Sequence, residues 1–138
     1  MAELIVATGL VEYNINGAFK LTINPTDSAF VEKLYAAFDA LDKKQEEYRA
    51  EVQKLETAQI FEYAKARDAE MRELIDGVIG IGGSDAIYGD MNVYAYADGL
   101  PVWANLFLAI LDVVDVSFAQ QEKLTSPRIA KYTKKYHK

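Results

Sequence analysis

A chain of 138 residues is the length of one domain, and a chain of this size buries roughly 68% of its unfolded surface, so it folds without a metal or a disulfide. Apolar residues make up 51% and charged residues 26%, which excludes a mostly disordered protein. With no cysteine and one histidine, His137, the composition leaves no thiol nucleophile and almost no material for a zinc site or a catalytic triad.

The N-terminal ten residues have no basic region and no cleavage motif, so they do not form a secretory signal. Residues 3–8 are rich in β-formers and predict a strand. A β-hairpin at about 10–24 follows, because apolar residues alternate with polar ones on both sides of Asn16-Gly17. A three-residue loop ending at Gly17 would set Tyr13 opposite Phe19 and keep the apolar side chains on one face.

Residues 26–76 contain no glycine or proline, and the segment Asn24-Pro25-Thr26-Asp27 before them ends a strand and caps a helix. Two apolar stripes that differ in phase predict helices near 27–57 and 59–77, with a turn within 56–60. The first stripe has one polar position, Gln45.

The middle of the first predicted helix, 42–51, is too polar for a compact core. We favour a projecting arm around 42–58 that packs on a neighbouring helix of the same chain. The alternative is a coiled coil between copies, since apolar residues recur at heptad spacing there. A homo-oligomer would then form through Leu41, Tyr48, Val52 and Leu55.

Four glycines between residues 77 and 83 invite a phosphate-loop interpretation, but no Gly-Lys-Ser/Thr follows them, so a flexible connector is favoured. Asp90 is positioned to cap a short element over 91–97. Pro101 then opens the most apolar helix, near 101–121, and Ser126-Pro127 either ends or punctuates it before a mobile basic tail. The apolar run of about fifteen residues within it is shorter than the roughly 20 that span a bilayer, so no membrane segment is expected.

These elements predict an α+β fold that is mainly α, with an N-terminal β-hairpin, long helices and an apolar C-terminal helix. One globular domain would cover 1–122, with the basic tail at 123–138. The domain carries a net charge of −12 and the tail +6, so nucleic acid is an unlikely partner for the domain. For the tail, a solvated basic terminus and a functional contact are equally open. A contact would be docking on an acidic neighbouring subunit, with single-stranded nucleic acid as the alternative, and its residues would be Arg128, Lys131, Lys134 and Lys135.

With no thiol and a single histidine, pairs of carboxylates are the remaining side chains that could catalyse a reaction. Glu70 and Glu73 share one helical face, as do Asp112 and Asp115, but both faces are predicted to be solvated. The sequence therefore predicts a protein that is not an enzyme and that uses no metal and no cofactor.

The order of these parts resembles a known class of proteins. The hairpin runs into Asn-Pro-Thr-Asp-Ser-Ala-Phe-Val-Glu-Lys-Leu at 24–34, and Asp98-Gly99 precedes Leu-Pro-Val-Trp-Ala-Asn-Leu-Phe-Leu-Ala-Ile-Leu-Asp at 100–112. Together with the long charged helix, and over most of 11–131, these segments resemble the tail assembly chaperones of tailed phages and prophages.

This resemblance implies a non-enzymatic protein of the bacterial host cytoplasm that binds the tape measure protein, self-associates and aids tail tube assembly. A structural tail or head-completion protein and a phage-encoded inhibitor of a host defence enzyme are the alternatives. A chaperone needs apolar surface for its client. The partner-binding face is expected at Tyr94, Leu100, Trp103 and Phe107, although Trp103 and Phe107 equally fit a core.

Overall fold

The computed structural model describes residues 1–136, with side chains for residues 1–125 and Pro127. The fold is α+β and mainly α: an N-terminal two-stranded hairpin is followed by long helices and an apolar C-terminal helix. In chain order the elements are β1 (Val11–Ile15), β2 (Phe19–Ile23), α1 (Ser28–Val52), α2 (Thr57–Ile79), α3 (Gly83–Tyr88), β3 (Tyr96–Ala97), β4 (Leu100–Pro101) and α4 (Val102–Tyr136).

The hairpin has the predicted three-residue loop, but the loop is shifted by one position. It consists of residues 16–18, so that Tyr13 pairs with Leu21 rather than with Phe19. Asn16 and Gly17 both have positive φ, and Ala18 N–H donates to the carbonyl of Ile15. A tight turn with two left-handed residues therefore sets the register. The apolar side chains still lie on one face of the hairpin, as predicted, because the observed and predicted partners of each residue differ by two positions and alternate residues point to the same face.

The helix α1 begins where the sequence predicts it to begin. The Asp27 carboxylate accepts from Ala29 N–H at 3.0 Å, and Asn24 Oδ1 accepts from Thr26 N–H at 2.9 Å. The turn between α1 and α2 covers residues 53–56, slightly before the predicted position. Glu56 fixes its end, since the side chains of Glu56 and Gln59 form a reciprocal capping box at the start of α2.

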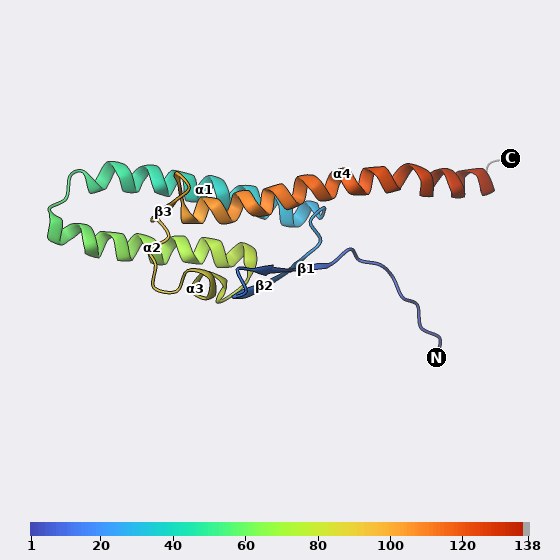
Figure 1. The fold of residues 1–138 in the computed structure, drawn as a ribbon, viewed down its shortest axis with the longest axis horizontal. Helices are drawn as coiled ribbons and strands as arrows, with labels where there is room; N and C mark the ends of the chain where they lie inside the picture. The colour runs from blue at the N-terminus through green and yellow to red at the C-terminus, as the bar shows by residue number, and fades with distance from the viewer. Residues whose placement is uncertain (137–138) are drawn as a thin grey trace.

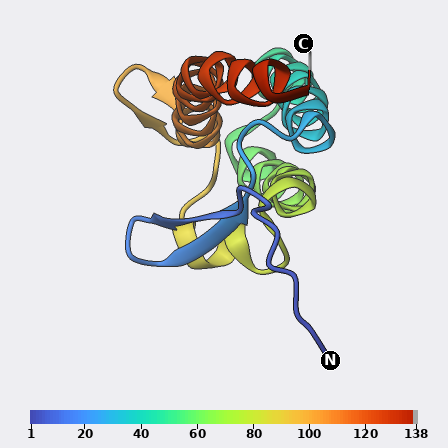
Figure 2. The ribbon, with the colours of Figure 1, turned by 90° about the vertical axis from the view of Figure 1, so that its right-hand side faces the viewer.

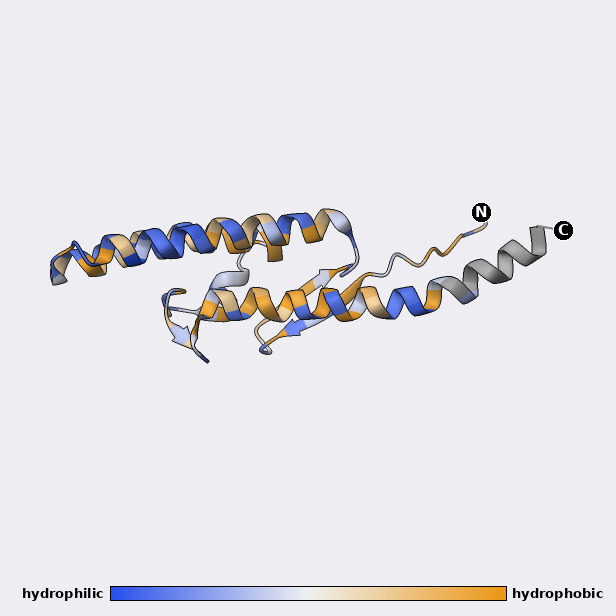
Figure 3. Cartoon of the chain, turned by 90° about the horizontal axis from the view of Figure 1, so that it is seen from above, coloured by the Kyte–Doolittle hydropathy of each residue, from blue (hydrophilic) through white to orange (hydrophobic). Residues whose placement is uncertain are grey.

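The helices α1, α2 and α4 surround the core (Figures 1 and 2). The closed end of the α1–α2 hairpin projects beyond the other elements on the left of Figure 1. The polar surface of these two helices contrasts with the apolar first half of α4 (Figure 3). The most deeply buried large side chains are Leu34, Leu41, Met71, Ile75, Val93, Trp103 and Phe107.

The segment after α3 differs from the prediction, because residues 91–97 do not form one element capped by Asp90. Asn92 Oδ1 accepts from Tyr94 N–H at 2.9 Å, which holds a turn at this point. Asp98 and Gly99 then take positive φ and join β3 to β4 in a small hairpin beside α4. Side-chain contacts thus compete here with the local preference for a capped helix.

The helix α4 does not end near residue 121, as the sequence predicted. It continues through Pro127 to Tyr136, so the backbone of the basic tail is helical as far as the structure describes it. Proline removes one backbone donor from a helix but does not prevent the flanking turns from forming. Residues 137–138 of the predicted tail lie outside the described part.

Residues 3–8 do not form the predicted third strand. They run as an extended segment away from the hairpin, toward the same end of the molecule as the second half of α4 (Figures 1 and 3). Asn24 Nδ2 donates to the carbonyl of Thr8 at 2.9 Å, which holds the start of this segment.

Candidate functional site

A hollow between the β1–β2 hairpin and α4 is the candidate functional site, and we call it the hairpin–α4 groove. Its central part has a volume of about 250 Å³ and a mostly apolar lining. The hairpin contributes half-buried Tyr13 and Ile15, and α4 contributes Ala109 and Val113. The central lining consists of Tyr13, Asn14, Ile15, Asn16, Leu21, Ile23, Leu106, Ala109, Ile110 and Val113.

The sequence produces this groove because two elements are apolar over more surface than the core covers. On the hairpin, Leu21 and Ile23 reach the core, while Tyr13 and Ile15 remain half-buried. On α4, the lining residues recur three or four positions apart, which places them on one helical face. The exposed Ala109 is small, so it leaves space where a larger side chain would fill the groove.

The groove continues along α4 in both directions. Beyond the hairpin turn it opens into a hollow of about 360 Å³ between Ile87, Met91 and Val102. At the other end a more polar hollow of about 550 Å³ is lined by Thr8, Gln120 and other residues. From Val102 to Gln121 a helix rises by about 28 Å at 1.5 Å per residue. The groove is therefore long enough for several turns of a second helix.

The predicted partner-binding residues mostly lie elsewhere. Trp103 is 2% exposed and Phe107 is fully buried, so of the two alternatives the burial supports the core. Trp103 Nε1 donates to Gln45 Oε1 at 2.9 Å, which explains the polar position in the first stripe. Tyr94 is also buried, and only Leu100 offers an exposed side chain. These four residues therefore do not form a shared surface.

The predicted self-association residues face the interior of a single chain. Leu41 is fully buried. Tyr48 stacks on Tyr94 with ring centroids 4.1 Å apart and on Tyr63 at 5.8 Å. Val52 and Leu55, near the tip of the α1–α2 hairpin, are half-buried. Leu41 and Tyr48 of the stripe therefore pack within the chain, and self-association stays a prediction. The predicted tail contacts lie in the last turns of α4, and their side chains lie outside the described residues.

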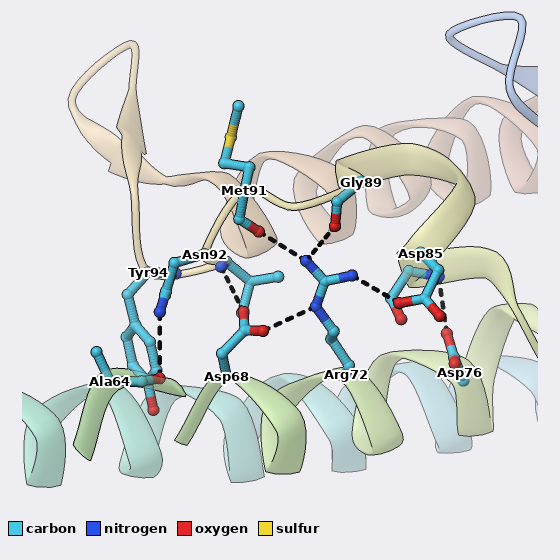
Figure 4. A network of polar contacts seen from close by, with 11 residues as sticks. Ala64, Asp68, Arg72, Asp76, Asp85, Gly89, Met91, Asn92 and Tyr94 are labelled. Atoms are coloured by element: carbon cyan, nitrogen blue, oxygen red, sulfur yellow. Dashed lines mark hydrogen bonds and ion pairs between the residues drawn. The ribbon is translucent and has the colours of Figure 1, made fainter. Parts of the chain in front are cut away.

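The connector between α2 and α4 is held by Arg72, which is not among the predicted site residues (Figure 4). Arg72 Nε donates to Asp68 Oδ2 at 2.9 Å, and a terminal nitrogen donates to Asp85 Oδ1 at 2.7 Å. The other terminal nitrogen donates to the carbonyls of Gly89 and Met91 at 2.8 and 2.7 Å. The Arg72 side chain is 13% exposed. One side chain therefore ties α2, α3 and the following loop together.

Neighbouring polar groups complete this Arg72 network. Asp68 uses its second oxygen to accept from Val93 N–H at 2.8 Å, and Asp76 accepts from Ser84 N–H at the same distance. Asn92 donates to a carbonyl of α2. The network fixes the connector, and Tyr88 and Met91 of this connector line the hollow at one end of the groove. Its role is structural, because each carboxylate in it is engaged by donors of the same chain.

Burial raises the pKa of both Tyr88 and Tyr94 above the usual value of about 10. The folded protein then keeps protons that the unfolded chain releases, so this contribution to stability is present below pH 10 and is lost as the pH rises further. We expect Tyr94→Phe to weaken the loss of stability above pH 10, measured by urea unfolding across pH 7–11.

Tyr88→Phe is the matched control at neutral pH. Tyr88 Oη donates to the carbonyl of Val102 at 3.0 Å, whereas the buried Tyr94 hydroxyl has no hydrogen-bond partner among the described residues. Tyr88→Phe should therefore cost about 1 kcal/mol at pH 7 and Tyr94→Phe close to nothing. Equal losses of unfolding free energy in both variants would contradict this assignment.

The described residues give little material for catalysis. In this part of the chain no group of three or more His, Asp or Glu side chains is placed to hold a metal ion. The Ser84 hydroxyl is completely buried and has no hydrogen-bond partner, so no base is present to activate it. Asp112 and Asp115 are exposed on α4. The mostly apolar lining of the groove is suited to binding another apolar surface.

One helical stretch, Val102–Thr125 of α4, is long and apolar enough to cross a membrane by length and composition. A third of its most apolar window is buried within the fold, and core helices of water-soluble proteins meet the same criterion, so this stretch is weak evidence for a membrane segment.

No protein-family model, curated protein or solved structure matches this chain.

Proposed function

We propose that this protein is a non-enzymatic tail assembly chaperone of a tailed phage or prophage, which binds the tape measure protein in the bacterial cytoplasm and aids assembly of the tail tube. The observation that supports this proposal best is the hairpin–α4 groove, a surface about 28 Å long that is apolar along most of its length and more polar at the Gln121 end, on a chain without a catalytic constellation among its described residues. The resemblance at 24–34 and 100–112 supplies the identity of the client.

The shape of the groove suits an amphipathic client helix. A helix that lies along α4 would bury an apolar stripe against Ala109, Val113 and Val116, and its polar face would remain in water. About 28 Å corresponds to five turns, or roughly 18 residues of the client. Tape measure proteins are long and helical in the class that this chain resembles, so repeated segments of that length are available to several copies of the chaperone.

The charges at the groove favour a client with basic residues beside its apolar stripe. Asp112 lies on the α4 side of the groove and is exposed. Residues 1–122 carry a net charge of −12, so the field around the domain attracts cations and repels phosphates. This balance favours a protein client over nucleic acid.

Ala109→Arg tests the groove directly. A long charged side chain on its floor should weaken client binding by about tenfold or more, because the arginine occupies the space of the client's apolar stripe. Ala109 is exposed, so the fold should be retained. The measurement is retrieval of the tape measure protein encoded in the same operon, after co-expression with the tagged chaperone.

Leu108→Arg is the matched control. Leu108 is the neighbouring residue, it is 38% exposed, and it does not line the groove. Retained binding in this variant and lost binding in Ala109→Arg would support the proposal. If no tape measure gene lies in the operon, or if both variants retrieve the protein equally, the proposal fails. Finding the chain in purified virions would favour a structural tail protein instead, and retrieval of a host nuclease would favour an inhibitor.

A further inference from the structure

The N-terminal segment has the properties of a strand that lacks a partner. Residues 3–8 read Glu-Leu-Ile-Val-Ala-Thr, and the segment is extended and free of proline. Leu4 and Ile5 are 92% and 91% exposed, which is a large unfavourable exposure for two apolar residues. Between Glu3 and Glu12 there is no charged side chain that would oppose strand pairing.

The hairpin offers a matching edge. In residues 1–136 the strand β1 pairs only with β2, so its outer edge presents unpaired backbone donors and acceptors. Val11 on this strand is 42% exposed, and Tyr13 lines three of the hollows along the groove. A third strand at this edge would therefore cover apolar surface as well as pair the backbone.

The segment of the same chain is directed away from that edge. The carbonyl of Thr8 accepts from Asn24 Nδ2 at 2.9 Å, at the end of β2. Gly9 has φ +71° there, and a Cβ at this position would approach Asn24 Nδ2 to 2.7 Å, so glycine permits the contact. The segment consequently leaves the hairpin rather than folding back beside β1 (Figures 1 and 2).

We propose that residues 3–8 of one copy add as a strand to the free edge of β1 in a second copy, and that two copies exchange their segments reciprocally about a two-fold axis. The segment and the edge are present once in each chain, so a two-fold pair satisfies both at once. Six residues match the five of β1 in length. Because the segment leads directly into β1 of its own chain, reciprocal pairing is antiparallel.

The second copy is favoured over a different protein by surfaces at the same end of the molecule. Of the sixteen large apolar side chains that are exposed in the described part, nine lie on residues 1–11 or on α4 beyond residue 115. Val116, Phe118 and Leu124 on α4 are exposed, and Ser117 and Gln120 from the same stretch of α4 line a hollow together with Thr8 of the segment. If two copies pair at this end, each copy covers exposed apolar side chains of residues 1–11 and of α4 beyond residue 115 in the other. This inference does not depend on the client of the groove.

The oligomeric state tests the proposal. We expect the full chain to have twice its monomer mass of 15.4 kDa in light scattering at high micromolar concentration. Ile5→Pro removes a backbone donor in the middle of the segment and should shift the protein to monomer. Ile5→Thr keeps the donor and the strand preference, so it should remain dimeric. Unchanged helical circular dichroism shows that both variants fold.

Cross-linking tests where the segment lies, because the chain has no cysteine of its own. Copies carrying Val6→Cys are mixed with copies carrying Asn14→Cys on β1, or with copies carrying Lys20→Cys on β2. An added strand lies about 5 Å from β1 and about 10 Å from β2, so oxidation should join Val6→Cys to Asn14→Cys and not to Lys20→Cys.

Three results would overturn the proposal: a monomeric full chain, a dimer that persists in Ile5→Pro, or cross-linking that favours Lys20→Cys. None of these measurements uses the client, so their outcome is obtained separately from that of the Ala109→Arg test, although an added strand would cover Tyr13 at the groove. Conversely, loss of client binding in Ala109→Arg without a change in mass would leave the strand exchange intact.

Discussion

Replacing Trp103 with alanine is expected to lower the free energy of unfolding by about 3–5 kcal/mol. The indole is 2% exposed and makes edge contacts with Phe38 and Phe107, at centroid distances of 5.6 and 6.2 Å. Truncation leaves a cavity where α1 and α4 meet and also leaves the Gln45 amide without its buried donor. Urea unfolding followed by circular dichroism measures the change.

Gln45→Leu separates the two contributions in this prediction. The side chain is 6% exposed, and leucine fills a similar volume without accepting the indole N–H, so the loss should be about 1–3 kcal/mol. A Trp103→Ala variant with unchanged stability and lost client binding would show instead that the side chain belongs to an interface.

Arg72→Ala is expected to destabilise the fold by about 3–5 kcal/mol, because it leaves the largely buried Asp68 carboxylate without its cationic partner and two backbone carbonyls without their donor. The connector would loosen first, since Arg72 joins α2 to α3 and to the loop after it. Hydrogen exchange should show lost protection at Val93, whose N–H donates to Asp68.

Lys44→Ala provides the comparison for this network. Lys44 pairs with Glu70 at 3.1 Å between α1 and α2, but both side chains are about one third exposed, so the loss should stay near 1 kcal/mol or below. Arg72→Lys should recover only part of the stability, because an ammonium group cannot reach all four acceptors. Equal effects of Arg72→Ala and Lys44→Ala would contradict the network's importance.

The main elements of the fold follow from local signals in the sequence. The long stretch without glycine or proline predicts α1 and α2, and Asp27 caps α1 as expected. The predicted hairpin loop lies one residue before the observed one. The alternation of apolar and polar residues does not distinguish registers whose partners differ by two positions, because both put the same side chains on the same face. The predicted end of the last helix near residue 121 is wrong, and of the two roles predicted for Pro127 the structure has the proline within the helix rather than at its end.

Tertiary relations were harder to predict. The polar Gln45 and the lone Trp103 were both noted as unusual, but nothing local indicates that residues 58 positions apart form a hydrogen bond. Asp68 interrupts an apolar stripe and Arg72 follows it by one turn, which is a visible signal for an ion pair. The loop carbonyls that Arg72 reaches have no signature in a sequence, because every residue has one.

The candidate site could not be predicted for the same reason. The hairpin–α4 groove depends on the angle at which the hairpin lies across α4 and on the small size of Ala109. Aromatic residues were instead assigned to a surface, and the structure places Trp103 and Phe107 inside. Large aromatic residues serve cores and interfaces alike, so residue type alone does not distinguish the two.

The burial of the single tryptophan has an optical consequence. Because Trp103 is the only indole in the chain, all of the tryptophan fluorescence comes from the place where α1 and α4 meet. The rings of Phe38 and Phe107 and the amide of Gln45 shield this emission from water and dissolved quenchers. Events at the hairpin edge or at the far end of α4 leave the indole in place, whereas separation of α4 from α1 exposes it. The chain thus contains a native optical probe for the docking of these two helices.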